Sequence, residues 1–521
     1  ALQANTTGDN NTAVGQAALA FNTTADANTA VGRFSMFCNT TGAGNTSVGQ
    51  NSLSSNTTAS DNTAVGHQAL FTNVTGANNT AIGKNALYYN TVSSNTAVGQ
   101  LAMTNTTTGA ENTAVGQNAL TANTTGCRNT GLGINALSGN TTGRENIAIG
   151  RNTLDANTTG VDNTAIGNSS LTTNTTGHSN TAAGKDALNQ NTTGCHNTSI
   201  GLNSLYENTT ANNNTAVGYK ALEVNTTGAS NTGVGKESLC SNTTGASNTA
   251  VGQTALASNT TASNNSAFGL NALTNNTTGT DNVAMGRSAM YSNTTGGTNT
   301  GIGSEALYTN TTGINLTALG KGALALDTTG SYNTAGGFEA LCANTTGSEN
   351  AAFGYMASKC QTTGTFNTSI GAGAGCQLTT GSNNTFLGHI AGRVGSPATV
   401  TTGSNNIVIG NNTSTNAYIK IDWTVTSDLR DKTQIEDVPH GLDFVNNLNP
   451  IKYKFKKSRD NDTPQGDIKY GFGAQDILKL EGDNPVIINN KQDDILKITN
   501  AHLIPVLVNA IKELTARVKE L

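Results

Sequence analysis

The sequence predicts a mainly β fold, in which a parallel β-solenoid (β-roll) of 17-residue repeats precedes a small α+β domain. Three observations support this fold class. A motif of the form Asn-Thr-Ala-Val-Gly recurs at a fixed period over most of the 521-residue chain. Charged residues make up only 11 % and aromatic residues only 5 % of the composition, which argues against a series of large globular cores. The last 95 residues hold 29 of the 59 charged side chains, so a different kind of domain begins near residue 420.

The repeat has 24 copies, whose leading residue runs from Asn11 to Asn406. The step from Asn79 to Asn95 is one position shorter than the others, and Leu316 takes the place of the leading Asn in one copy. We use residues 11–27 as the reference repeat and name each position after its residue there. A self-similar period of roughly 20 residues is typical of a solenoid, in which each unit is too small to bury its own face.

The composition of the repeat favours short strands over helix. Most copies contain two Gly and many Thr and Asn, which cost helix propensity, whereas short strands with Gly at fixed corners accommodate them. Proline is absent before Pro397, as expected for strands that form continuous ladders.

Stacking the repeats assigns a role to each position. We expect the Val14 and Leu19 positions to form two inward aliphatic ladders, and the Asn11 and Asn22 positions to form ladders of amide side chains. Gly residues are expected to supply corners with positive φ. The expected exceptions, where Ala replaces Gly, are Ala25, Ala59, Ala211 and Ala262.

A rung with about two large apolar residues makes a thin core, so its apolar edges should need burial between chains. We therefore expect a homotrimer. The repeat motif, as in Asn79-Thr80-Ala81-Ile82-Gly83, resembles the head repeats of trimeric autotransporter adhesins, which form a parallel β-roll. Those repeats are shorter than the repeat of this chain, so the resemblance does not fix the handedness of the solenoid.

Other features narrow the classes of function. A net charge of −5 without a basic stripe predicts no nucleic-acid partner, and the lack of a long apolar run predicts no membrane insertion. The seven Cys show no CxxC pair, so we predict no metal and no cofactor, although a disulfide among Cys342, Cys360 and Cys376 stays open beside free thiols. The chain begins inside a repeat without Met or signal peptide, which suggests a fragment or processed product that lacks an N-terminal anchor.

The sequence divides into three parts. Residues 1–413 are the predicted solenoid shaft, and residues 414–426 are a predicted cap and junction. Within the junction, Tyr418–Val425 alternates like a strand and contains the only Trp of the chain. Residues 427–521 form the predicted α+β domain.

Four blocks in the last part occur in a characteristic order. They are Ser427-Asp428-Leu429-Arg430-Asp431-Lys432, Leu448–Phe455, Tyr470–Ile477 and a C-terminal helical heptad. Together they resemble the intramolecular chaperone domain of endosialidases and other phage tail spikes and fibres. The resemblance implies a domain that assembles three chains, folds the preceding fibre and then releases itself by autocleavage.

The same resemblance implies the site residues. Ser427 would be the nucleophile, Lys432 its general base, and the Thr426–Ser427 peptide bond the bond that is cut. A Ser hydroxyl needs an adjacent base, and a helical turn could bring Lys432 near it. Supporting, orienting roles fall to Asp428 and Arg430. The alternative is that Ser427 is only a helix N-cap.

The C-terminal segment carries a heptad seam. Its apolar residues follow steps of 3 and 4, at Ile504, Leu507, Ile511, Leu514, Val518 and Leu521. The seam favours oligomerisation, although a helix that packs into a globular core would show a similar pattern.

These features predict a phage or virus tail fibre or spike that attaches to a host surface receptor, either a glycan or a surface protein. We expect the protein in the virion, or outside the cell or on its surface. Any enzymatic activity is at most self-cleavage by a Ser-Lys autoprotease, with no external substrate. A microbial adhesin or filament with the same domains is the alternative, and an ice- or glycan-binding solenoid the third. The Asn-Thr-Thr sequences also match a glycosylation sequon, which we interpret as a corner motif.

Overall fold

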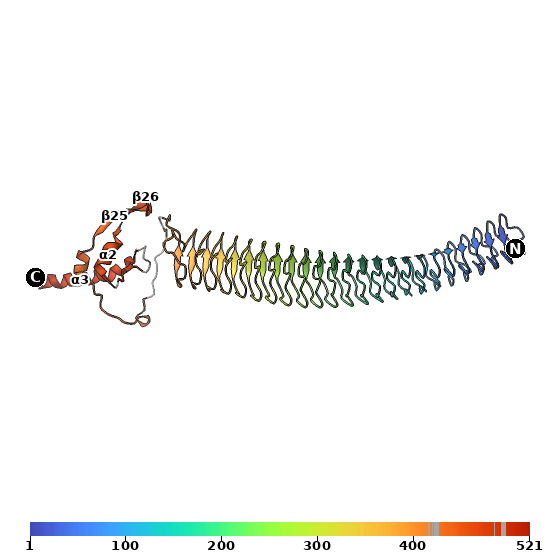
Figure 1. Ribbon diagram of the computed structural model, residues 1–521, viewed down its shortest axis with the longest axis horizontal. Helices are drawn as coiled ribbons and strands as arrows, with labels where there is room; N and C mark the ends of the chain where they lie inside the picture. Colours follow the sequence, from blue (N-terminus) through green and yellow to red (C-terminus); the bar gives the residue numbers. More distant parts are fainter. Residues whose placement is uncertain (415–416, 419, 421–426, 484, 491–495) are drawn as a thin grey trace. The chain divides into compact units, whose positions relative to one another are not determined.

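The computed structural model describes residues 1–414, 417–418, 420, 427–483, 485–490 and 496–521. The chain forms two compact units, Ala1–Gly410 and Asn411–Leu521. The first unit is a parallel β-solenoid and the second an α+β domain, as the sequence predicts (Figure 1).

The solenoid contains 24 strands of three residues each, one per repeat. They are β1 (Thr12–Val14), β2 (Thr29–Val31), β3 (Thr46–Val48), β4 (Thr63–Val65), β5 (Thr80–Ile82), β6 (Thr96–Val98), β7 (Thr113–Val115), β8 (Thr130–Leu132), β9 (Ile147–Ile149), β10 (Thr164–Ile166), β11 (Thr181–Ala183), β12 (Thr198–Ile200), β13 (Thr215–Val217), β14 (Thr232–Val234), β15 (Thr249–Val251), β16 (Ser266–Phe268), β17 (Val283–Met285), β18 (Thr300–Ile302), β19 (Thr317–Leu319), β20 (Thr334–Gly336), β21 (Ala351–Phe353), β22 (Thr368–Ile370), β23 (Thr385–Leu387) and β24 (Ile407–Ile409).

Each strand pairs in parallel with the strand of the next repeat, in register. Thr12 lies opposite Thr29 and Val14 opposite Val31. The one shortened repeat leaves this register intact, because Thr80 still lies opposite Thr96. That repeat therefore loses its residue in a turn and not in the strand. The resulting stack of rungs runs from blue to yellow-orange in Figure 1.

The core of the solenoid is made by the Leu19 row and by small residues. The Leu19 position is inward, as predicted, and its Leu and Met side chains are fully buried from Leu19 to Leu341. The prediction for the Val14 position is wrong. Val14 is 58 % exposed, whereas Ala30, the middle residue of the next strand, and the Ala residues equivalent to it in later strands are fully buried.

Strand geometry explains the correction. Successive side chains of a strand point to opposite faces, so only the middle residue of a three-residue strand faces the interior. The Leu19 row fills most of a narrow cross-section, and an Ala opposite it completes the core. The larger Val, Ile, Leu, Phe and Met side chains of the Val14 position therefore point outward and form a second apolar row on the surface, which we call the Val14 row.

The predicted Asn ladders are confirmed. At the Asn22 position most amide nitrogens donate to the amide oxygen of the preceding rung, as from Asn39 to Asn22 at 2.9 Å, and to a carbonyl three residues on, as from Asn39 to Gly42 at 2.9 Å. At the Asn11 position the side-chain oxygen accepts from the next backbone N–H, as Asn28 does from Asn45 at 3.0 Å. Buried amides with both ends paired bind successive rungs together.

The two Gly of the repeat serve different purposes. Gly at the Gly15 position has positive φ, for example +133° at Gly201, as predicted. Gly at the Ala25 position does not have positive φ, so this part of the prediction is wrong, and the absence of φ strain explains why Ala25 and its Ala equivalents are accepted. Most of the other positive-φ corners are non-Gly residues, including the buried Leu19 at 49°. Tight packing of the Leu side chain compensates for a backbone region that L-residues usually avoid.

The second unit combines a hairpin with short helices. Its elements are the 3-10 helix η1 (Leu429–Asp431), α1 (Leu442–Asn446), β25 (Pro450–Ser458), β26 (Asn461–Phe472), α2 (Ala474–Glu481), β27 (Ile488–Asn489), β28 (Lys497–Ile498), the 3-10 helix η2 (Asn500–His502) and α3 (Leu503–Glu520). Strands β25 and β26 pair antiparallel, and β27 pairs antiparallel with β28. The core of the unit joins Phe444 of α1, Ile477 of α2, and Leu503 and Val506 of α3.

Helix α3 presents two apolar faces. Leu503, Val506 and Ala510 are buried, so this face belongs to the domain core. The predicted heptad seam is a different face and is exposed, with Ile511 at 62 %. One face of the helix therefore packs into the core of its own domain, and the other face, the heptad seam, is left exposed.

Two remaining predictions can be placed. All seven Cys are free thiols, so no disulfide links Cys342, Cys360 and Cys376. The proposed cap Tyr418–Val425 lies mostly outside the described residues.

None of the helices in the described ranges is long and apolar enough to cross a membrane.

Candidate self-cleavage site

A single turn of 3-10 helix brings the predicted site residues together. Asp428 precedes η1, and its carboxylate accepts from the backbone N–H of Arg430 at 2.9 Å, which makes Asp428 the N-cap. The chain turns so that the Nζ atom of Lys432 donates to the Oγ atom of Ser427 at 2.7 Å. The alternative in which Ser427 itself caps the helix does not describe this turn, because Asp428 takes that role.

Asp428 and Arg430 form a second pair within the same turn. Nε of Arg430 lies 3.1 Å from both carboxylate oxygens of Asp428, and Nη2 lies 2.5 Å from Oδ2. The Arg430 side chain and backbone together lower the pKa of the Asp428 carboxyl, and the carboxylate in turn raises the pKa of Arg430. Asp428 therefore remains ionised and anchors both the turn and the Arg430 side chain.

The site is open in the single chain. Ser427 and Lys432 are exposed, and Asp428 is half-buried. Thr426, the other partner of the predicted scissile bond, lies outside the described residues. Among the described residues, no group of three or more His, Cys, Asp or Glu side chains is arranged to hold a metal ion. What the turn supplies is a Ser hydroxyl next to a Lys amine, a pairing that can support acyl chemistry.

The other sequence blocks form the framework of the same domain. Leu448–Phe455 leads into and forms most of β25, and Tyr470–Ile477 spans the end of β26 and the start of α2. Glu513 of α3 ties the start of α1 to the domain, because its Oε2 accepts from the backbone N–H of Leu442 at 2.7 Å. The blocks are thus separate elements that fold onto a shared core.

The fold and the turn define a class of protein: a long β-solenoid that precedes a small domain opening with a paired Ser and Lys. Residues 427–484 match the family described as "Chaperone of endosialidase" (Peptidase_S74). The C-terminal part is thus an endosialidase-type chaperone domain, preceded by the solenoid. Such domains are typical of phage tail fibres and release themselves by autoproteolysis. No curated protein shows significant similarity to the chain.

The family match begins at Ser427, the residue whose hydroxyl contacts Lys432. The catalytic roles of Ser427 and Lys432 stay predictions, as do the supporting roles of Asp428 and Arg430. Sequence reasoning missed the N-cap role of Asp428, although an Asp two residues before Arg430 is a usual capping signal.

Proposed function

We propose that this protein is a homotrimeric tail fibre that mediates host attachment, and that its C-terminal domain drives trimer folding and then cuts itself off. The observation that carries this proposal is the 2.7 Å contact between Lys432 Nζ and Ser427 Oγ at the first residue of the chaperone domain. A cut at this point separates the solenoid from the chaperone without removing residues from either.

The cleavage chemistry follows from the position of the nucleophile. Ser427 Oγ attacks the carbonyl carbon of Thr426, and its proton passes to the neutral amine of Lys432. The C–N bond then breaks, the proton moves to the departing nitrogen, and an ester joins residue 426 to Ser427 Oγ. Water hydrolyses the ester, which leaves a carboxyl group on residue 426 and a free amine on Ser427. A neutral amine is required for the first step, and burial favours it.

Trimer assembly would supply that burial. Ser427 and Lys432 are exposed in the single chain, so neighbouring chains that cover the turn would remove water from the amine. Cleavage then follows assembly, which is the useful order, because a chaperone released from an unassembled chain could not guide it.

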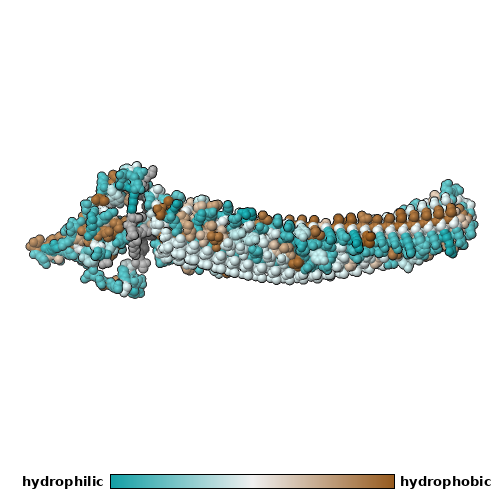
Figure 2. All heavy atoms as spheres, in the orientation of Figure 1, coloured by the Kyte–Doolittle hydropathy of each residue, from teal (hydrophilic) through white to brown (hydrophobic). Residues whose placement is uncertain are grey.

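Two surfaces support association between copies of the chain, while the number of three copies rests on the match to the chaperone family. The Val14 row continues along the solenoid, with Ile166 and Ile370 each more than 40 % exposed, and Figure 2 shows hydrophobic side chains aligned along the solenoid. The row is interrupted only where Ala183 and Gly336 replace a larger side chain, and an aligned set of exposed apolar side chains of this kind is typical of an interaction surface. The exposed heptad seam of α3 gives the second unit an apolar face of its own. If copies of the chain associate through both surfaces, the exposed apolar side chains of the solenoid and of the second unit are both buried.

Cleavage is tested by denaturing electrophoresis and N-terminal sequencing of the purified full chain. We expect two fragments, the larger ending at Thr426 and the smaller beginning at Ser427. Ser427→Ala removes the nucleophile, and Lys432→Met removes the base, so each variant should give one full-length band. Lys432→Arg is informative because it keeps a cation near Ser427 but cannot accept the proton at neutral pH, so it should also remain uncut.

Ser414→Ala is the matched control, since it removes a hydroxyl at the start of the junction, far in sequence from Ser427, and should leave cleavage unchanged. Full cleavage of Ser427→Ala, or a new N-terminus at another residue, would refute the assignment of this site.

A further inference from the structure

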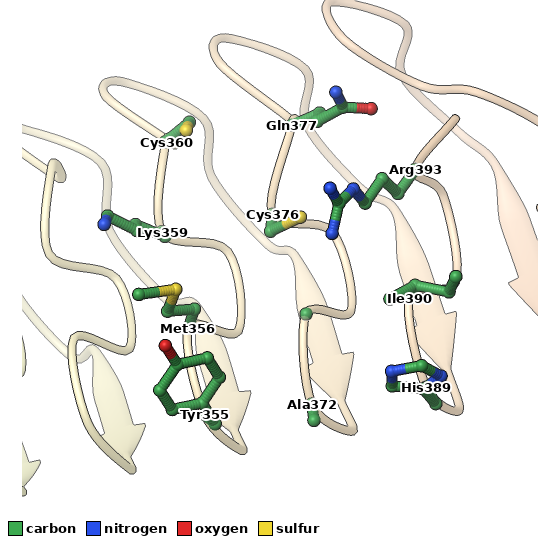
Figure 3. A pocket seen from close by; sticks show the side chains of 11 residues that line it. Tyr355, Met356, Lys359, Cys360, Ala372, Cys376, Gln377, His389, Ile390 and Arg393 are labelled. Carbon is green, nitrogen blue, oxygen red and sulfur yellow. The ribbon is translucent and has the colours of Figure 1, made fainter. Parts of the chain in front are cut away.

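The solenoid contains a break in an aromatic stack. At the Gln16 position the rings of Phe338 and Tyr355 stack on adjacent rungs, with centroids 5.5 Å apart and planes 12° apart. The next rung carries Ala372 at this position, and the rung after that carries His389. Figure 3 shows Tyr355, Ala372 and His389 in a row along successive rungs. One ring is therefore missing between Tyr355 and His389.

The missing ring opens a hollow of about 380 Å³, which is in the range of small-molecule sites. Its floor is formed by the small residues Ala372, Gly373 and Cys376, and its ends by the larger side chains of the flanking rungs. Rungs repeat at about 4.8 Å, so Tyr355 and His389 lie on rungs about 9.6 Å apart. A ring that contacts both Tyr355 and His389 needs a separation of about 7–8 Å between these two side chains, because each contact takes about 3.5–4 Å, and the spacing of the rungs provides this separation.

The rim of the hollow is positively charged. Figure 3 shows the Arg393 side chain reaching over the floor toward Cys376. Nζ of Lys359 lies 2.6 Å from Oε2 of Glu339, so these two charges form an ion pair. Among the described residues, no carboxylate forms an ion pair with Arg393. A guanidinium group is suited to bind a carboxylate through two parallel hydrogen bonds.

A polar donor completes the site. The Oε1 atom of Gln377 accepts from the backbone N–H of Val394 at 2.9 Å, which fixes the amide and leaves its NH2 group to donate. One face of Tyr355 is covered by Phe338, so the other is left for a ring over Ala372. The hollow thus combines an aromatic face, a hydrogen-bond donor and a guanidinium group.

We propose that this hollow binds a carboxylated sugar ring of a surface glycan. The C–H face of the sugar packs on Tyr355, a hydroxyl accepts from Gln377, and the carboxylate pairs with Arg393. A sugar fits better than a flat aromatic acid, because the site is open to solvent and offers polar contacts at its rim. The placement of this sugar on a host surface rests on the proposed attachment role, but its binding does not depend on cleavage.

The test uses the full chain with methyl β-D-glucuronide as probe, followed by saturation-transfer NMR and calorimetry. Methyl β-D-glucoside, which lacks the carboxylate, should bind about tenfold more weakly, as expected for loss of a charged hydrogen bond. Acetate at the same concentration should not displace the glucuronide, because it lacks the ring.

Two variants examine the two halves of the site. Ala372→Tyr should fill the gap and abolish binding, and it should fold, since Tyr219 and Tyr355 occupy the same position on other rungs. Arg393→Gln should abolish the preference for the glucuronide over the glucoside. Arg151→Gln, at the Gln16 position of a distant rung, is the matched control and should bind as the unaltered chain does.

Unchanged binding by a folded Ala372→Tyr variant would overturn the inference, as would equal binding of both sugars to the unaltered chain. Failure of both sugars to bind would also overturn it. None of these results would alter the cleavage pattern of the Ser427 variants, so failure of this inference is distinguishable from failure of the proposed function.

Discussion

Replacement of Asp327 by Asn is expected to stabilise the solenoid at neutral and alkaline pH. Asp327 occupies the Asn22 position of its rung and is fully buried. Its Oδ1 accepts from Nδ2 of Asn344 at 2.8 Å, which continues the ladder on one side. Its Oδ2 has no hydrogen-bond partner, because an ionised carboxylate cannot make the donations that an Asn amide makes at this position.

Burial therefore raises the pKa of the Asp327 carboxyl to about 8, against a usual value of 3.8. The folded state favours the protonated form, whose O–H restores a donor to the ladder. Stability is thus highest below the unfolded pKa, falls as pH rises toward 8, and is constant above it. Each pH unit corresponds to 1.36 kcal/mol, so the rung loses about 4 kcal/mol between pH 5 and pH 8.

Hydrogen exchange measures this effect locally, which suits a repeat protein whose rungs can open separately. The amide of Thr328 donates to the carbonyl of Thr345 at 2.8 Å and reports on the Asp327 rung. Its opening free energy should fall by about 4 kcal/mol from pH 5 to pH 8 in the unaltered chain. Asp327→Asn should abolish that dependence. The amide of Thr192, many rungs away, should show neither effect.

Asn208→Asp is the matched control, because Asn208 has the same ladder position in a regular stretch, donating to Asn191 at 2.8 Å. It should introduce the pH dependence that Asp327→Asn removes. The reasoning is refuted if the Thr328 amide shows the same opening free energy at pH 5 and pH 8, or if Asp327→Asn destabilises its rung.

Three further predictions concern folding and assembly. Gly201→Ala should lower the thermal stability measured by circular dichroism, because φ is +133° there, whereas Gly194→Ala should have the smaller effect because φ is not positive at Gly194 and Ala is already found at the equivalent position of the next rung, Ala211. Leu205→Ala should cost about 2–5 kcal/mol in denaturant unfolding, since it opens a cavity in the fully buried Leu19 row; a loss below that of the exposed Ile200→Ala would contradict the assigned core. Ile511→Asp should prevent assembly in analytical ultracentrifugation, because it places a charge on the exposed seam of α3; unchanged assembly would exclude the seam as an interface.

The repeat made the solenoid predictable, since a fixed period gives both the number of rungs and their register. The same period predicted the Asn ladders, because identical amides at a fixed spacing must meet. The turn at Ser427 was also predicted, because a helical turn can bring Lys432, five positions further on, into contact with Ser427. These features depend on local sequence and on one stacking direction.

Features that depend on the cross-section were not predictable in the same way. The sequence pattern marks the Val14 position as apolar but does not say which face of a three-residue strand is inside. That choice depends on the volume that Leu19 leaves for its neighbour, and the small Ala fits it. The hollow over Ala372 was missed for a related reason, since a missing ring is visible only when residues one repeat apart are stacked.

The most direct test of the central claim is the native mass of the uncut Ser427→Ala full chain and of the cut solenoid, measured by light scattering coupled to size exclusion. The proposed trimer, which rests on the match to the chaperone family and on the exposed Val14 row, predicts three copies of the 53.0 kDa chain before cutting, and three copies of the solenoid afterwards. A stable single chain in both samples would contradict the account.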